Sequence, residues 1–148
     1  MGVAAAIAGI TIGMLGEPYV DPVQQECIAK NIYYEARSEP IEGQIAVAHV
    51  TMNRVRHTNW PNTPCEVVYE PKQFSWTFLV KDQNPKDKKL YDQAMVIARD
   101  VLIGNTTDPT YGAVFYHASY VNPSWNKQMD VSKIIGLHIF YTWDGTWD

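Results

Sequence analysis

Between Ile41 and Arg56 the apolar side chains leave almost no polar face until Asn53 is reached; they are Ile45, Ala46, Val47, Ala48, Val50, Met52 and Val55. Glu39 and Pro40 precede this segment as a cap position and a proline suited to a first helical turn, so we expect a helix over 41–56. A helix that is apolar nearly all round is buried through the middle of a domain, because none of its faces favours water. The chain must therefore fold by covering this helix on several sides.

The segment before this helix places one carboxylate against the expected core. Counting back from Glu35 in steps of four gives Asn31 and Cys27, and the neighbouring ridge of the same helix is Ile32, Ile28 and Gln24. Burial disfavours the charged form of a carboxyl group, so it raises the pKa and leaves a proton donor near neutral pH. Protonation of a leaving oxygen requires such a donor. The alternative is a helix-end carboxylate that pairs with Arg37 or faces water.

The rest of the sequence indicates one more long helix and two short strands. Asn84-Pro85 predicts the start of the helix, Asp87 lies in its first turn and Gly104 closes it. Its apolar stripe consists of Leu90, Ala94, Ile97, Ala98 and Val101. The segments 113–117 and 137–141 have short β-type alternation and are expected to pair. We therefore expect an α+β fold that is mostly helical with a small antiparallel β element.

Length and charge limit the number of domains and the partners. The 148 residues suit one domain with a single core, which we expect to be a monomer spanning 17–148. The net charge of −4 gives no basic footprint, so nucleic acid is not an expected partner. The apolar segment Met1–Gly16 is short for a membrane span and lacks the Lys or Arg of a signal peptide. A weak signal-anchor, a signal remnant and an ordered helix all remain open for it, and no stable membrane span is expected.

Six ordered elements between about residues 25 and 141 carry a family resemblance. They are Tyr34-Glu-Ala-Arg-Ser-Glu-Pro with Glu42-Gly-Gln-Ile-Ala-Val-Ala and Met52-Asn-Arg-Val, then Trp60-Pro-Asn-Thr-Pro-Cys-Glu-Val-Val-Tyr, Gln73-Phe-Ser-Trp, Tyr111-Gly-Ala-Val-Phe-Tyr-His, Pro123-Ser-Trp and Ile135-Gly-Leu-His-Ile-Phe-Tyr. Together they resemble the signature of the SleB/CwlJ-type cell-wall hydrolases, which cleave peptidoglycan in bacteria and their phages.

The resemblance implies a fold, a substrate and a catalytic residue. It implies a lysozyme-like, lytic-transglycosylase-like domain that acts on peptidoglycan without a cofactor or a metal ion. The catalytic acid of the family matches Glu35, and its second acidic position matches Glu39. Ser38 stands where the family usually has glycine, and the change removes no required side chain.

The number of available carboxylates bears on the reaction. A glycoside hydrolase of the usual type needs a second carboxylate, about 5 Å from the first for retention and up to about 9.5 Å for inversion. Only Glu39 and Glu42 lie near Glu35 in the sequence. With a single acid, Glu35 can protonate the glycosidic oxygen and then deprotonate the C6 hydroxyl of the sugar, which gives a 1,6-anhydro-muramyl product. The resemblance also points to this lytic transglycosylase reaction.

Further residues in and near the matched elements are candidates for the site. Asn53 and Arg54 are expected to orient Glu35 or the acetamido group of a sugar, while Gln73, Ser75 and Tyr141 are expected to line a groove. Flat aromatic faces stack on the apolar faces of sugar rings, although most aromatic side chains serve the core. The candidates for substrate contact are Trp76, Tyr116, His117, Trp125, His138 and, for stacking, Tyr141.

Two alternative functions and the state of the two cysteines remain open at this level. A zinc amidase or peptidase acting on the stem peptide would need His117, His138 and an acid such as Asp130 as ligands, although the histidines lack HExxH spacing. The other alternative to glycan cleavage is a wall-binding virion protein without catalysis. Cys27 and Cys65 are either a disulfide, as suits an enzyme outside the cytoplasm, or two buried thiols.

The site of action is the least constrained property. The favoured expectation is a phage-derived endolysin-like enzyme that acts in cell lysis on periplasmic peptidoglycan, and a secreted bacterial enzyme is the alternative.

Overall fold

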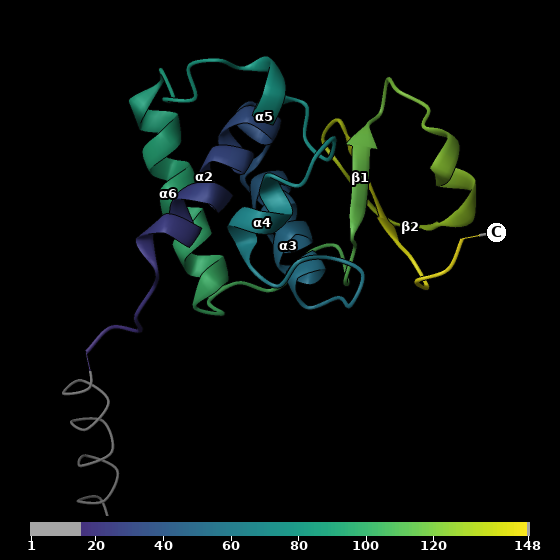
Figure 1. Ribbon diagram of the computed structural model, residues 1–148, viewed down its shortest axis with the longest axis horizontal. Helices are drawn as coiled ribbons and strands as arrows, with labels where there is room; N and C mark the ends of the chain where they lie inside the picture. Colours follow the sequence, from purple (N-terminus) through teal and green to yellow (C-terminus); the bar gives the residue numbers. More distant parts are fainter. Residues whose placement is uncertain (1–15, 148) are drawn as a thin grey trace, which may run out of the picture.

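The computed structural model describes residues 16–147 of the chain. The expectations for Met1–Gly16 therefore fall on residues outside this range, except for Gly16. Figure 1 shows the helices gathered on one side and a small sheet on the other, with α3 between them. Within residues 16–147, no helix combines the length and the apolar character that crossing a membrane requires.

Three helices of 15 residues each form the larger part: α2 (Pro22–Ala36), α3 (Ile41–Val55) and α6 (Lys88–Leu102). The N-cap residue of α2 is Asp21, whose side chain accepts a hydrogen bond from the Val23 amide at 2.9 Å. The predicted helix that carries Glu35 is confirmed, since α2 ends one residue after it.

The α3 helix lies at the centre, as its composition predicts. On one side Ala48 packs with α2 and α6 in a core that includes Ile28, Ile32, Ala94, Ile97, Ala98 and Val101. On the other side Val47 and Val50 pack against Phe140 and Ile135 of the sheet. Both faces of α3 are thus buried, and the helical and sheet parts share this helix as a common wall.

One predicted helix start is wrong, and one predicted cap residue differs. The α6 helix begins at Lys88 rather than at Asn84-Pro85, because the Asp87 side chain is the N-cap and accepts from the Leu90 amide at 3.1 Å. The α3 helix begins at Ile41 as predicted, but its N-cap residue is Pro40, which makes no side-chain hydrogen bond. The Glu39 side chain accepts a hydrogen bond from the Leu137 amide instead of capping the helix.

Three short elements between and after the long helices were not predicted: α4 (Pro64–Val68), α5 (Trp76–Leu79) and the 3-10 helix η1 (Ser124–Gln128). Each has at most five residues, too few to show a helical period in the sequence. The clearest local signal is Thr63, which caps α4 by accepting from the Glu66 amide at 3.3 Å.

The sheet has three antiparallel strands, β1 (Phe115–Ala118), β2 (Asp130–Ile135) and β3 (His138–Thr142), in the order β1-β3-β2. The predicted pairing of the segments 113–117 and 137–141 is confirmed, with His117 opposite Ile139. The β2 strand was missed. It lies at an edge and exposes Val131 and Ile134 together with Asp130, so its sequence shows no apolar-polar alternation.

Glu39 fastens the bend between α2 and α3 to the turn between β2 and β3. Its Oε1 accepts a 2.8 Å hydrogen bond from the Leu137 amide. Gly136 has φ +55°, and a Cβ atom there would lie 2.8 Å from the same oxygen. The left-handed backbone conformation favours glycine at this position, and a Cβ atom would also displace the Glu39 carboxylate from the Leu137 amide.

Cys27 and Cys65 form a disulfide that joins α2 to α4, with the Cα atoms 5.2 Å apart. The alternative of two buried thiols is therefore wrong. The bridge closes a loop with a sequence separation of 38 residues next to the helix that carries Glu35.

Replacing both cysteines, as Cys27→Ala/Cys65→Ala, is expected to lower the free energy of unfolding by about 3–4 kcal/mol, because the unfolded chain gains the entropy of the open loop. Urea denaturation followed by circular dichroism measures the change. The wild-type chain with a reductant should lose a similar amount. Equal stability of the oxidised wild type and the double variant would contradict a stabilising role for the bridge.

Candidate active site

A cavity of about 720 Å³ lies where the helical part meets the sheet. Its walls come from α3, the segments between α3 and α4 and between α4 and α5, strand β1, η1 and the residues after β3. The lining residues are Arg54, Asn59, Trp60, Glu70, Lys72, Gln73, Phe115, Tyr116, Trp125, Trp143 and Trp147.

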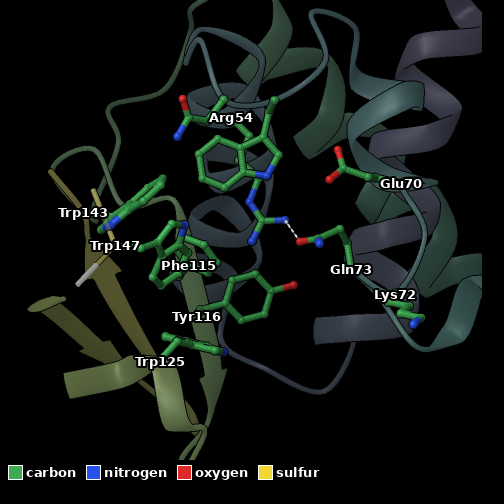
Figure 2. A pocket seen from close by; sticks show the side chains of 11 residues that line it. Arg54, Glu70, Lys72, Gln73, Phe115, Tyr116, Trp125, Trp143 and Trp147 are labelled. Carbon is green, nitrogen blue, oxygen red and sulfur yellow. Dashed lines mark hydrogen bonds between the residues drawn. The ribbon is translucent and has the colours of Figure 1, made fainter. Parts of the chain in front are cut away.

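The two sides of the cavity differ in chemistry. Figure 2 shows the aromatic rings of Phe115, Trp125, Trp143 and Trp147 on one side. It shows the polar side chains of Glu70, Lys72 and Gln73 on the other side. An apolar wall facing a hydrogen-bonding wall suits a sugar, which has apolar ring faces and a polar rim.

Glu35, in the last turn of α2, is partly buried. The Tyr116 hydroxyl donates a 2.8 Å hydrogen bond to Glu35 Oε1, which links the last turn of α2 to β1. Burial raises the pKa of Glu35 above its usual value of 4.5, and the Tyr116 hydrogen bond and the charge of Arg54 oppose this shift in part. The carboxyl group is therefore a stronger candidate for proton donation than a solvated glutamate. Glu35 itself is not among the residues that line the cavity, whereas Tyr116 is.

Arg54 is buried and fixed at the centre of the site. Its Nε donates to the Val114 carbonyl at 2.7 Å and its Nη1 donates to Gln73 Oε1 at 3.3 Å. The guanidinium carbon lies 5.2–5.3 Å from the ring centres of Trp60, Phe74 and Phe115. Burial lowers the pKa of Arg54 to about 10, so the group stays charged at neutral pH. The structure thus brings both Arg54 and Gln73 to the site.

Asn53, the neighbour of Arg54, serves the fold instead. Its Nδ2 donates to Asp108 Oδ2 at 2.8 Å and to the Ala113 carbonyl at 2.9 Å, so both amide hydrogens hold the loop before β1. The structure does not support the expectation that Asn53 orients Glu35 or an acetamido group.

The two candidate histidines of the sheet are engaged within the protein. His138 is 8% exposed, its Nδ1 lies 3.4 Å from Glu39 Oε1, and its ring centre lies 5.1 Å from that of Tyr116. Burial lowers the pKa of His138, while Glu39 opposes the shift. His117 bonds the Tyr141 hydroxyl through Nε2 and the Ala118 carbonyl through Nδ1, each at 2.7 Å. Since a carbonyl only accepts, Nδ1 carries the proton in His117.

Several of the expected substrate contacts are core or surface residues. Trp76 is only 4% exposed and donates through Nε1 to Asn31 Oδ1 at 2.8 Å, so its ring has no free face for a sugar. Tyr141 is 5% exposed and Ser75 is exposed, and neither lines the cavity. Of the aromatic candidates, Tyr116 and Trp125 do line it.

The ligand set of the zinc alternative does not assemble. Across residues 16–147 no group of three or more His, Cys, Asp or Glu side chains has an arrangement that could hold a metal ion. His117, His138 and Asp130 therefore do not form the site that a zinc amidase would need.

Several lining residues were not identified from the sequence. Trp60 stands in a matched element but was not singled out, and Glu70 and Lys72 lie just before the Gln73 motif. Phe115 is in the Tyr111 element, whereas Trp143 and Trp147 follow the last motif. A cluster of tryptophans in polar surroundings after the last strand was the one available signal for the final pair.

Comparison with known proteins identifies a family and a shared fold. A family model described as Cell Wall Hydrolase matches residues 38–141. The chain is 33% identical over 116 residues to the spore cortex-lytic enzyme of Bacillus subtilis, covering 76% of this chain and 35% of that protein. It is 34% identical over 121 residues to the spore cortex-lytic enzyme of Oceanobacillus iheyensis, covering 78% of this chain and 40% of that protein. The chain thus spans less than half the length of these curated relatives.

Two solved structures share the fold. One is the catalytic domain of the germination-specific lytic transglycosylase SleB from Bacillus anthracis, with 29% identity, a TM-score of 0.69, and coverage of 85% of this chain and 99% of that chain. The other is the catalytic domain of the Bacillus cereus SleB protein, with 28% identity, a TM-score of 0.65, and coverage of 84% and 94%. The expected α+β, lysozyme-like fold is confirmed.

The Tyr116 hydroxyl stabilises the charged form of Glu35, so Tyr116→Phe is expected to raise the pKa of Glu35 further. Carbon-detected NMR of the labelled carboxyl group during a pH titration, assigned with Glu35→Gln, measures this pKa. Tyr120→Phe, at an exposed tyrosine, is the matched control. A pKa that stays unchanged or falls in Tyr116→Phe would show that the hydrogen bond does not act on Glu35.

Proposed function

The chain belongs to the cell wall hydrolase family, and we propose that it cleaves peptidoglycan glycan strands between N-acetylmuramic acid and N-acetylglucosamine, with Glu35 as the general acid and base. The observation that carries this proposal is the partly buried Glu35 carboxyl group, bonded to Tyr116 at the wall of a sugar-sized cavity. The similarity to spore cortex-lytic enzymes supports the same class of substrate.

In the first step, protonated Glu35 donates its proton to the glycosidic oxygen. The bond between this oxygen and C1 of the muramyl sugar breaks, and the next sugar leaves with a free hydroxyl group. Burial raises the pKa of Glu35, which keeps a larger fraction protonated near neutral pH than in a solvated glutamate. The Tyr116 hydroxyl and the charge of Arg54 stabilise the carboxylate that this step produces.

In the second step, the Glu35 carboxylate removes the proton from the C6 hydroxyl as O6 bonds to C1. The product is a 1,6-anhydro-muramyl end, and Glu35 regains the proton that it gave away. No water is consumed, so one carboxyl group is sufficient for the whole reaction. The similarity to a lytic transglycosylase catalytic domain supports this version.

Hydrolysis is the second candidate, because the cavity offers another carboxylate. Glu39 is held by the Leu137 amide, and Glu42 is exposed in the first turn of α3. Glu70, however, lines the cavity, and its charge partly offsets the lowering of the Arg54 pKa by burial. In a hydrolytic version, Glu70 would be the general base that activates water.

The proposed site of action is the cell wall outside the cytoplasm. The Cys27–Cys65 disulfide supports it, since such bridges persist in oxidising compartments. The curated relatives named above are bacterial proteins, while a phage origin stays a prediction.

Glu35→Gln is expected to lower kcat on purified peptidoglycan by at least about 100-fold, because the amide cannot transfer the proton. Release of soluble glycan fragments measures the rate, and EDTA should leave the wild-type rate unchanged. Glu42→Gln, at an exposed acid on the next helix, should keep wild-type activity. Full activity of Glu35→Gln would refute the assignment, and an inactive wild type would favour a wall-binding protein.

Glu70→Gln separates the two reactions. For transglycosylation we expect anhydro-muramyl ends from both the wild type and this variant, with kcat within about 3-fold, because the second carboxylate is not needed. Mass spectrometry of the digested peptidoglycan identifies the ends. Reducing-end muramic acid from the wild type, together with a large loss of rate in Glu70→Gln, would establish hydrolysis instead.

A further inference from the structure

The residues after β3 form a compact turn that carries two tryptophans. Trp143 Nε1 donates to the Thr146 carbonyl at 2.6 Å, and the Thr146 amide and hydroxyl donate to Asp144 Oδ1 at 2.9 and 2.8 Å. Gly145 has φ +92°, which closes the turn. We call residues 143–147 the tryptophan turn. It lies beyond residue 141, where the match to the family model ends.

The tryptophan turn is packed against the aromatic side of the cavity. The ring of Trp143 lies 5.8 Å from that of His57 at an angle of 16°, and 4.8 Å from that of Trp147. The ring of Trp147 in turn lies 6.2 Å from that of Phe115 on β1. These contacts hold both indoles in place beside strand β1, so they present a preformed surface.

Trp147 is not a core residue. It is 54% exposed although it is one of the largest apolar side chains, and it lines the cavity. Figure 2 shows both indoles across the cavity from Gln73 and Lys72. A rigid indole with a free face, opposite amide and ammonium groups, matches a pyranose ring with its hydroxyl and acetamido substituents.

We propose that the tryptophan turn is an additional sugar-binding subsite that extends the glycan groove beyond the sugars bound next to Glu35. The ligand class is the N-acetylated hexosamine of a glycan strand, stacked on Trp147. The proposal rests on the proposed function, since it takes the cavity to be the glycan groove. The subsite acts through binding, so it favours long strands over short fragments and takes no part in proton transfer.

The test uses equilibrium binding to the full chain carrying Glu35→Gln, so that ligands stay intact. The probes are peptide-free peptidoglycan glycan oligomers of one to four disaccharides, titrated by calorimetry. Adding Trp147→Ala should weaken binding of the longest oligomer by about 10-fold and leave a single disaccharide nearly unaffected, because one stacked ring is lost. Trp147→Phe, which keeps a ring, should retain most of the affinity, and Tyr120→Ala controls for loss of an exposed aromatic side chain elsewhere.

The outcomes distinguish this subsite from the proposed reaction. Unchanged affinity for the longest oligomer, or an equal loss at every length, would overturn the subsite whether or not Glu35 is the acid. Cleavage of the oligomers by the Glu35→Gln chain would overturn the catalytic assignment. The comparison between Trp147 variants would then be repeated with chitin oligomers in which sulfur replaces the glycosidic oxygens, because these linkages resist cleavage.

Discussion

The 2.8 Å hydrogen bond from the Tyr116 hydroxyl to Glu35 Oε1 joins residues 81 positions apart, one on a helix and one on a strand. It forms only if the sheet is seated correctly against α3, which Val47, Val50 and Phe140 secure by packing. Glu39 adds a second connection at the β2–β3 turn through the Leu137 amide. The burial that raises the pKa of Glu35 is thus a property of the whole fold, and any slip of the sheet would expose the carboxyl group.

Arg54 limits how far burial raises the pKa of Glu35. A buried guanidinium that stays charged lowers the pKa of Glu35, while Glu35 and Glu70 favour the charged form of Arg54. Its Nε and Nη1 are fixed by Val114 and Gln73, so its position does not depend on substrate. In the proposed reaction, this fixed positive charge would stabilise the Glu35 carboxylate that proton donation leaves behind, without solvent reorganisation.

Periodicity made the three long helices predictable. The apolar character of 41–56 predicts the central helix. The spacing of Glu35 with Asn31 and Ile32 predicts the partial burial of Glu35. The cavity was harder to predict, because its walls come from segments without a helical or strand period in the sequence. Trp60 and Glu70 lie on connections, and Trp143 and Trp147 follow the last strand. Trp76 shows the converse error, since an aromatic residue in a matched motif can serve the core just as well as a groove.

The most direct test of the central claim is a crystal structure of the Glu35→Gln chain with a glycan strand spanning the cavity. The account predicts that the scissile glycosidic oxygen lies about 2.6–3.2 Å from the side-chain amide at position 35, with Tyr116 beside it. A strand whose scissile oxygen lies out of reach of position 35 and against the Glu70 carboxylate would contradict it.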